Sequence, residues 1–546
     1  MEYRDIVFVI VELILCIFLF WFASFTEKKK SSKLKLAWLA PAAAAAAFFI
    51  PLSGFDISLI TVYLAVIILA AGFFSENSKL RRIVAAAGAV LIASAVIVCT
   101  KSGIYRRADY VRDFENIFEE AEKRYVLTKH KSIDWKALHD KYLPAFRKAN
   151  KDNDAVENYI QWNRLCAEFH DGHVNYFSNK SGVREEAEKR ASGYDYGMVT
   201  MKLSDGRYVA LSVDRSLEKY GIHQLTEITS WDGMTLDEAA ERSVLRQMQG
   251  FPDIDNELFY KAVFAGGTGG DTVEVTYIND EGEEVSAELH RLGGCYFERM
   301  KECLDTIDQS YPAANMTLNK VNDTTACIKI CGMLYDSKTI KEENYYIFQR
   351  SLEKQLLEYK EQGIKDIILD IRGNIGGDDG IVSSIARLLA PEGEHFYAND
   401  PMWDTKNNCY ELDENGNYVV NFPYRFEGED IMDGGKIIIL VNSQSVSAAD
   451  HLIKIMSQFD NVTVMGFTEP NGSAQGISII DGEQGSFILS TSALLDENGN
   501  IFIDSGTDRQ SGDDLDIKIP FDEKAVNELF NKGNDYLLDK ALELLE

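Results

Sequence analysis

The residues best suited to chemistry lie in two short turns near the carboxyl end of the chain. In residues 442–450 (Asn-Ser-Gln-Ser-Val-Ser-Ala-Ala-Asp), Ser447 lies between an apolar stretch and an amphipathic one. A serine between a buried strand and a helix start can present its hydroxyl to a site, where free helix N–H groups stabilise developing negative charge. Ser447 is therefore a candidate nucleophile. Ser447-x-x-Asp450 also has the form of a helix capping box, so a purely structural role stays open.

The second turn, residues 370–377, reads Asp-Ile-Arg-Gly-Asn-Ile-Gly-Gly. A strand that runs into such a turn exposes several backbone N–H groups in a small concavity, which suits a phosphate or an oxyanion. No Gly-Lys-Ser/Thr follows, so the turn is not a P-loop. A tight strand-to-helix turn would need glycines in any case.

A serine nucleophile needs a base, and His173 is the candidate. It ends the sequence Phe-His-Asp-Gly-His at residues 169–173, beside Gly172, which allows close backbone approach. A lone histidine is more often structural. The pair His170 and His173 could suggest a metal site, but no third ligand is evident, so we predict neither a metal nor an organic cofactor.

Alternating strands and helices surround the two turns. Apolar runs predict strands at 326–330, 366–371 and 436–442, and amphipathic patterns predict helices at 341–362, 380–389 and 448–458. This alternation predicts a mostly parallel sheet. Ligand sites in such sheets lie at the carboxyl ends of strands, which is where both turns fall.

Helices and then short strands precede this section. Residues 108–170 have helical periodicity, with one apolar face, and further helices open near residues 132–135 and at Asp154; we expect Gly172 to stop the last one. From 195 to 292 short alternating runs dominate. Residues 221–233, followed by a helix at 236–242, resemble the carboxyl half of a PDZ domain, although a generic small β domain stays open.

The first 107 residues differ from the rest in hydropathy and charge. Apolar stretches at 6–24, 36–53, 57–74 and 83–99 are each near the length of about 20 residues that spans a bilayer. Lysines at 28–35 and basic residues at 79–82 predict cytoplasmic loops, which places everything after residue 99 outside. The basic residues Lys101, Arg106 and Arg107 weaken this orientation. The first span lacks the basic start of a cleavable signal peptide.

At 546 residues the chain needs three or more folded units. Residues 1–107 carry 12 Lys and Arg against 6 Asp and Glu, whereas the rest carries 44 against 80. So acidic a soluble part argues against nucleic acid or anionic lipid as its partner. Eight cysteines are present without metal-ligand spacing. A disulfide such as Cys295–Cys303 would fit an exported domain, but the sequence leaves this open.

Taken together, these features resemble the tail-specific (carboxyl-terminal processing) and tricorn-type serine peptidases over roughly residues 110–525. The resemblance rests on the helical segment with Ile-Asp-Trp at 133–135, the Phe-x-Asp-Gly-His element at 169–173, the PDZ-like insert, Asp-x-Arg-Gly-Asn-x-Gly-Gly at 370–377 and Ser-x-Ser-Ala-Ala-Asp at 445–450. It implies that Ser447 is the nucleophile. It also implies an oxyanion hole formed by the N–H of Ala448 with that of Gly376 or Gly377.

The family has two solutions for the base, and the sequence separates them. Processing peptidases use a lysine about two dozen residues after the serine, but here that region, residues 466–473, contains none. Lys454 lies two turns down the predicted helix, too far from Ser447. The tricorn-type solution implies His173 as the base, oriented by a late carboxylate. Asp504 holds the position where that subgroup has glutamate.

We therefore predict four parts: a four-helix transmembrane anchor at 1–107, a helical subdomain at 108–190, a PDZ-like domain at 191–292 and an α/β peptidase core of the ClpP/crotonase-like kind at 293–546. The predicted protein is a multi-pass serine peptidase of a bacterial cell membrane. Its Ser-His site lies outside the cell and acts on peptides or proteins, bound through their carboxyl termini.

Two alternatives stay open. The first is a catalytically inactive relative that binds peptides as a membrane sensor or scaffold; it is favoured by aspartate at 504 and glycine at 172. The second is a transporter or sensor whose four helices are the functional part. It is disfavoured because Glu12 is almost the only ionisable residue within the spans.

Overall fold

The computed structural model describes residues 108–546, apart from 268, 310–315, 335–343, 408, 505, 507 and 511–514. Residues from Asp109 to Glu546 form one compact unit. Within the described part, no helix combines the length and the apolar character that crossing a membrane requires. The four predicted spans at 1–107 lie outside the described residues, and the proposed domain boundaries stay predictions.

Three helices open the unit: α6 (Tyr110–Arg124), α7 (Trp135–Asp152) and α8 (Ala155–Ala167). Each begins where an aspartate accepts a hydrogen bond from a first-turn N–H, and Asp134 and Asp154 do so at the predicted starts. The expected apolar face of α6 is buried. The prediction that Gly172 ends the third helix is wrong. α8 ends at Ala167, because the backbone turns into a left-handed conformation at His170 (φ 45°).

A mixed segment follows, and its core centres on Trp231, Leu236 and Val275. One sheet pairs β2 with β3, and another has the order β4-β5-β6. The elements of this segment are β1 (Asn175–Ser178), α9 (Val183–Ser192), β2 (Val199–Lys202), β3 (Tyr208–Leu211), η1 (Arg215–Tyr220), β4 (Ile228–Trp231), α10 (Leu236–Arg242), α11 (Val244–Gln247), α12 (Ile254–Tyr260), η2 (Lys261–Phe264), β5 (Thr272–Ile278), β6 (Glu284–His290) and α13 (Tyr296–Asp308).

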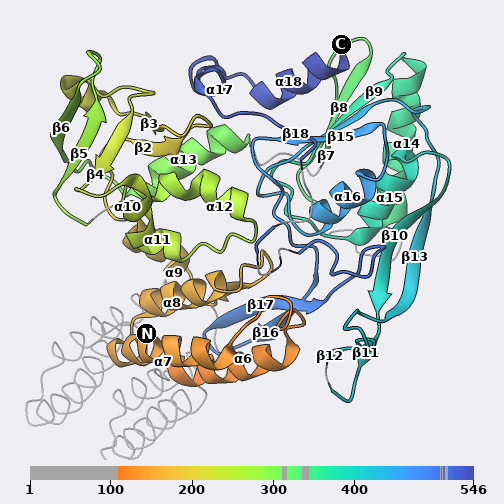
Figure 1. The fold of residues 1–546 in the computed structure, drawn as a ribbon, viewed down its shortest axis with the longest axis horizontal. Coiled ribbons are helices and arrows are strands. Elements are labelled where there is room, and N and C mark those ends of the chain that lie inside the picture. Colours follow the sequence, from red (N-terminus) through yellow and green to blue (C-terminus); the bar gives the residue numbers. More distant parts are fainter. Residues whose placement is uncertain are drawn as a thin grey trace, which may run out of the picture. The chain divides into compact units, whose positions relative to one another are not determined.

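A six-stranded sheet of order β18-β15-β14-β9-β8-β7 forms the centre of the last section, as Figure 1 shows. All neighbours pair in parallel except β7 with β8, so the predicted parallel sheet is confirmed. The strands are β7 (Met316–Lys320), β8 (Thr325–Ile330), β9 (Asp366–Asp370), β14 (Ile437–Leu440), β15 (Val462–Gly466) and β18 (Ile517–Lys518).

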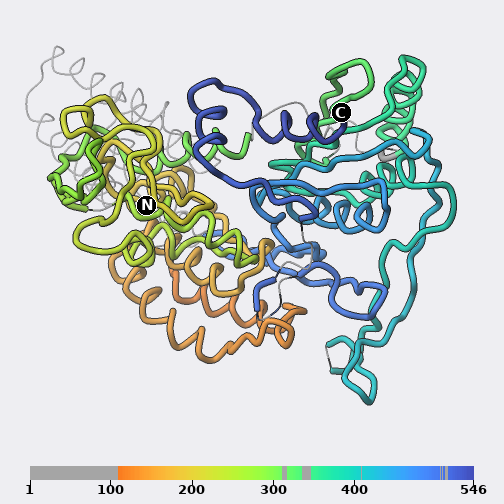
Figure 2. The backbone as a smooth tube through the Cα atoms, turned by 45° about the horizontal axis from the view of Figure 1, so that its top comes forward, coloured from red at the N-terminus to blue at the C-terminus, as the bar shows by residue number. Residues whose placement is uncertain are grey.

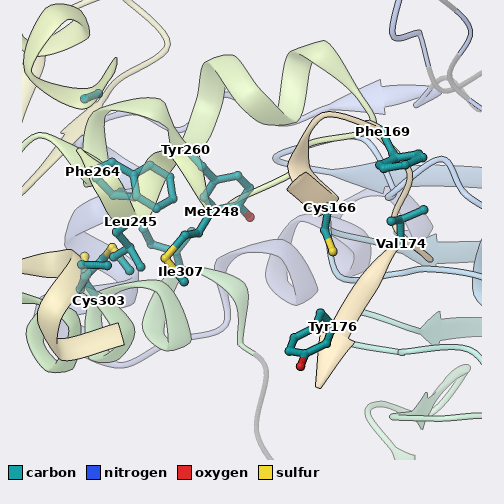
Figure 3. Packing of buried hydrophobic residues seen from close by; sticks show 14 of the residues in the cluster. Cys166, Phe169, Val174, Tyr176, Leu245, Met248, Tyr260, Phe264, Cys303 and Ile307 are labelled. Atoms are coloured by element: carbon teal, nitrogen blue, oxygen red, sulfur yellow. The ribbon is translucent and has the colours of Figure 1, made fainter. Parts of the chain in front are cut away.

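Both faces of this sheet are covered, which explains why its central strands β9 and β14 are mostly apolar. Ile367 and Ile439 face a core formed with α14 (Asn344–Glu361), α15 (Asp379–Leu389) and α16 (Ala448–Met456). Ile368 and Ile438 belong to the core on the other side, with α18 (Tyr536–Leu545). This second core continues into α6, α7 and α8. Figure 3 shows part of this core, including Tyr176 and Cys303.

Smaller elements complete the unit. β10 (Gly393–Pro401) and β13 (Val420–Gly428) pair as an antiparallel ribbon that runs away from the sheet in Figures 1 and 2 and ends in β11 (Trp403–Asp404) and β12 (Cys409–Tyr410). β16 (Gly476–Asp481) and β17 (Gly485–Ser492) join β1 in a second sheet. α17 (Glu523–Val526) and the π-helical turn η4 (Asn527–Lys532) precede α18.

The six cysteines in the described part of the chain are free thiols. Cys303 is buried on α13 and Cys295 lies at its start, so the Cys295–Cys303 disulfide that the sequence left open is not formed.

Candidate active site

The turn that carries Ser447 joins β14 to α16 at the carboxyl end of the sheet. Ser447 has φ 66° and ψ −121°, a backbone conformation that residues other than glycine rarely adopt. Strained backbone of this kind is common at functional sites and raises a serine hydroxyl above a strand-to-helix turn. The residue is partly exposed, so its hydroxyl can meet a substrate.

Asp450 holds this conformation from one turn further along α16. Its buried carboxylate accepts hydrogen bonds from the N–H groups of Ser447 (3.0 Å), Gly472 (3.0 Å) and Ser473 (3.1 Å). The capping interaction that the sequence suggested is therefore present. The Asp450 carboxylate also fixes the loop at Gly472 and Ser473, which contacts Ser447. Helix capping and a catalytic role for Ser447 are therefore compatible.

The glycine-rich turn after β9 lies directly against Ser447. A Cβ atom built on Gly376 would lie 2.5 Å from the Cβ of Ser447 and 2.9 Å from the N of Ala448. Gly376 donates its own N–H to the side-chain oxygen of Asn374 (2.9 Å). Among the described hydrogen bonds, none uses the N–H groups of Gly377 and Ala448. Of the three predicted donors, these two are therefore the ones available to an oxyanion.

Buried amides hold the two turns together. The side-chain oxygen of Asn442 accepts the N–H of Gly373 (2.9 Å), and the carbonyl oxygen of Asn374 accepts the N–H of Val446 (3.0 Å). The hydroxyl of Ser445 donates to the carbonyl oxygen of Ile371 (2.9 Å). Because these bonds run in both directions between the turns, the positions of the donors relative to Ser447 are fixed.

The loop that bears His173 reaches the same place through Ser473. The N–H of Gly172 donates to the Ser473 hydroxyl (2.9 Å), and the N–H of Ser447 donates to the Ser473 carbonyl oxygen (2.8 Å). A Cβ on Gly172 would lie 2.1 Å from the side-chain oxygen of Asn471, so this close approach requires glycine. Phe169 and Val174, labelled in Figure 3, anchor the two ends of the loop in the core.

The imidazole of His173 is 8% exposed, and its described ion pair is with Asp171, whose Oδ1 lies 3.9 Å from Nδ1. Burial lowers the pKa of His173, and the Asp171 carboxylate offsets part of that effect. Within the described part of the structure, neither ring nitrogen has a hydrogen-bond partner. A neutral, unbonded imidazole is in the correct state to accept a proton.

The carboxylate of Asp504 lies beside the positively charged amine of Lys131, at 2.5 Å from Nζ. The backbone of Asp504 forms an isolated antiparallel β-bridge with that of Ser473, so Asp504 does lie at the edge of the site. Burial raises the pKa of Asp504 well above its usual value, and Lys131 opposes this shift. The backbone of Asp504, the third predicted residue, therefore lies beside Ser473, which contacts Ser447. Its side chain, however, pairs with Lys131.

Comparisons with known proteins match part of this unit to a peptidase family. Residues 325–509, which contain both turns, match the model of peptidase family S41. The matched segment is an S41 domain, and it supplies the α/β core. The chain is therefore a serine-type peptidase.

Solved structures resemble the same unit. Mature CPAF aligns over 80% of this chain and 97% of its own, with 13% identity and a TM-score of 0.51. A CPAF mutant aligns with 12% identity and a TM-score of 0.50 over the same shares. The photosystem II D1 C-terminal processing protease covers 77% of this chain and 96% of its own, with 16% identity and a TM-score of 0.34. The two CPAF structures support a shared fold. No curated protein sequence gives a significant match.

The sequence analysis did not predict a second histidine near Ser447. His451 lies one helical turn after Ser447 and is 2% exposed, with Nδ1 3.1 Å from a carboxylate oxygen of Asp379. Its ring packs against those of Tyr397 and Phe502. The i, i+4 spacing from Ser447 was the available signal, because such residues share a helix face.

His170, the other half of the suggested metal pair, is used differently. Its Nδ1 lies 3.1 Å from the carbonyl oxygen of Phe251, and burial lowers its pKa. Among the described residues, no group of three or more potential ligands could hold a metal ion.

Proposed function

We propose that this S41 peptidase cleaves peptide bonds with Ser447 as the nucleophile and His173 as the general base. The observation that carries the proposal is the contact between the strained Ser447 and the glycine-rich turn at Gly376. It brings a serine hydroxyl and two unused N–H groups, of Gly377 and Ala448, to one point. A nucleophile beside an oxyanion hole is the arrangement that acyl transfer needs.

The chemistry follows from these positions. The Ser447 oxygen attacks the scissile carbonyl carbon while a His173 ring nitrogen takes its proton, and the N–H groups of Gly377 and Ala448 bind the resulting oxyanion. The C–N bond then breaks, and His173 passes its proton to the departing amine. Water, activated by His173 in the same way, hydrolyses the acyl-enzyme and restores the serine.

A fluorophosphonate probe on the full-length protein tests this assignment. We expect wild type to be labelled, Ser447→Ala to be unlabelled and His173→Ala to be labelled at least about 100-fold more slowly. His451→Ala is the matched control, because it removes another buried histidine near the same serine. Labelling lost in His451→Ala but kept in His173→Ala would move the base to His451. An unlabelled wild type would favour the inactive, peptide-binding relative.

We further propose that residues 1–107 anchor the peptidase in a bacterial cell membrane with its active site outside. The four apolar stretches and the two basic loops support this topology. Alkaline extraction of membranes should leave the protein in the pellet. Reporter fusions after residue 104 should report an external position, and fusions at residue 32 a cytoplasmic one. Release by alkali, or the reverse pattern, would contradict the proposal.

Residues 191–292 are proposed to present substrate carboxyl termini by strand addition, in the manner of a PDZ domain. Support comes from the separate core around Trp231 and from β4, which is followed by α10. Peptides with a free carboxyl terminus should then be cleaved with a lower KM than the same peptides carrying a terminal amide. Equal KM values would contradict this role.

A further inference from the structure

The Asp171 carboxylate is held rigidly beside His173. One oxygen, Oδ2, accepts hydrogen bonds from the Tyr125 hydroxyl (2.9 Å) and the Ser490 hydroxyl (2.8 Å). The other oxygen, Oδ1, accepts the backbone N–H of His173 (2.9 Å). The carboxylate has no exposed surface. Its plane is therefore fixed by groups from three separate segments of the chain.

The same Oδ1 faces the imidazole at 3.9 Å from Nδ1, about 1 Å beyond hydrogen-bond distance. A histidine that takes a proton inside a buried site becomes a cation, which is costly there without a counter-charge. Hydrogen bonds of catalytic groups are often long in unliganded enzymes and shorten when substrate binds. A small rotation of the ring would bring Nδ1–H into contact with Asp171.

Asp504 is committed to another partner. Its carboxylate pairs with Lys131, whose side chain is 4% exposed and which also donates to the carbonyl oxygen of His170 (2.8 Å). Without Asp504, this lysine would be a buried cation lacking its carboxylate. The pair therefore neutralises Lys131 and ties it to the backbone that leads into the His173 loop.

We propose that Asp171, rather than Asp504, is the positioning residue that orients His173 and stabilises its protonated form, while the Asp504–Lys131 pair secures the loop. This inference rests on the proposed Ser447–His173 mechanism. It assigns the two buried carboxylates different tasks that follow from their neighbours.

The proposal predicts a signature in pH dependence. Among the described residues, Asp171 is the charged group that acts on His173. The Asp504–Lys131 pair and the Tyr125 hydroxyl lie on the side of Asp171 and interact with it. Labelling of Ser447 rises with pH as His173 loses its proton. The Asp171 charge favours protonated His173, so removing it should move that rise to lower pH. A merely structural residue would change the amount of active protein but not the position of the rise.

The experiment measures the rate of fluorophosphonate labelling of full-length protein from pH 4 to 9. For Asp171→Asn we expect a plateau rate about 10²- to 10⁴-fold lower and a rise shifted down by about one pH unit. The matched control is the double variant Asp504→Asn with Lys131→Gln, which removes a nearby carboxylate and its partner together. Its rise should stay at the wild-type pH.

Circular dichroism and thermal unfolding check that each variant is folded. If Asp171→Asn does not fold, Tyr125→Phe with Ser490→Ala replaces it, because this variant keeps the carboxylate and removes both donors to Oδ2. A wild-type labelling rate in this variant overturns the proposal. So does a shifted rise in the Asp504/Lys131 control together with an unshifted rise in Asp171→Asn.

Failure of the inference is distinct from failure of the mechanism. Wild type labelled at Ser447 and dependent on His173, but unchanged by Asp171→Asn, would overturn only the role of Asp171. An unlabelled wild type, or labelling that survives Ser447→Ala, would overturn both.

Discussion

Ser447 and Ser473 meet through a backbone hydrogen bond of 2.8 Å from the Ser447 N–H to the Ser473 carbonyl oxygen. The Ser473 hydroxyl, in turn, accepts the N–H of Gly172, the residue before His173. The two halves of the proposed catalytic pair, 274 positions apart in the sequence, are thus connected through one buried residue. The geometry of the site should therefore depend on Ser473.

Replacing Ser473 with alanine should uncouple the His173 loop from Ser447. The variant loses the acceptor for the Gly172 N–H, so His173 is held less firmly, and we expect kcat/KM to fall about 10- to 100-fold. The free energy of unfolding should fall by only about 1–2 kcal/mol. Peptide hydrolysis and denaturant unfolding of the same preparation measure both.

Ser384→Ala is the matched control for this substitution. The Ser384 hydroxyl is also buried and donates to the carbonyl oxygen of Gly380 within α15. A similar loss of stability with unchanged kcat/KM is expected. Equal losses of kcat/KM in the two variants would mean that Ser473 has no specific role at the site.

Gly376→Ala should abolish labelling of Ser447. The new methyl group would lie 2.5 Å from the Ser447 Cβ and 2.6 Å from the Val446 carbonyl oxygen, and the backbone has φ 80°. Either the nucleophile or the oxyanion hole must move. Fluorophosphonate labelling measures the effect. Gly434→Ala isolates the backbone penalty, because Gly434 has a similar φ of 71° with open space around it. In Gly434→Ala the free energy of unfolding should fall by about 1–2 kcal/mol, with labelling intact. Full labelling of Gly376→Ala would contradict the proposed close contact between Gly376 and Ser447.

The sequence was most informative where the pattern is local. Apolar runs and glycines located β9, β14 and the turns after them, and adjacent parallel strands then necessarily bring Gly376 to Ser447. The partner of Asp504 was not predictable in this way. Lys131 precedes it by 373 positions, and pairing between buried side chains so far apart depends on the packing of the whole unit. Asp171, by contrast, lies two residues before His173, and only the structure shows that its carboxylate turns back to that ring.

Removing Arg372 should destabilise the S41 domain strongly. Its guanidinium is 1% exposed and binds the carboxylates of Asp370 and Asp535, which connects the glycine-rich turn to the start of α18. Arg372→Ala leaves both carboxylates without this partner, and we expect a loss of about 3–5 kcal/mol in the free energy of unfolding. Arg387→Ala removes a half-exposed ion pair with Glu429 and should cost about 1 kcal/mol or less. Denaturant midpoints compare the two; similar costs would show that burial of the Arg372 network adds nothing.

Asp308 should make stability fall as pH rises through the weakly acidic range. Burial raises the pKa of Asp308 to about 6, although the Tyr260 hydroxyl (2.7 Å) and the Gln444 amide (3.1 Å) both donate to its carboxylate. In the unfolded chain this carboxyl ionises near pH 4. Between these values the folded state holds a proton that the unfolded state has lost, so raising the pH favours unfolding, by about 3 kcal/mol at most.

Asp308→Asn tests this prediction, because the amide cannot ionise. We expect wild type to lose stability relative to Asp308→Asn as pH rises from 4 to 7, with the difference constant above pH 7. Urea midpoints at each pH measure it. Asp323→Asn removes a fully exposed carboxylate and should run parallel to wild type. A pH-independent difference between wild type and Asp308→Asn would mean that Asp308 titrates alike in the folded and unfolded chains.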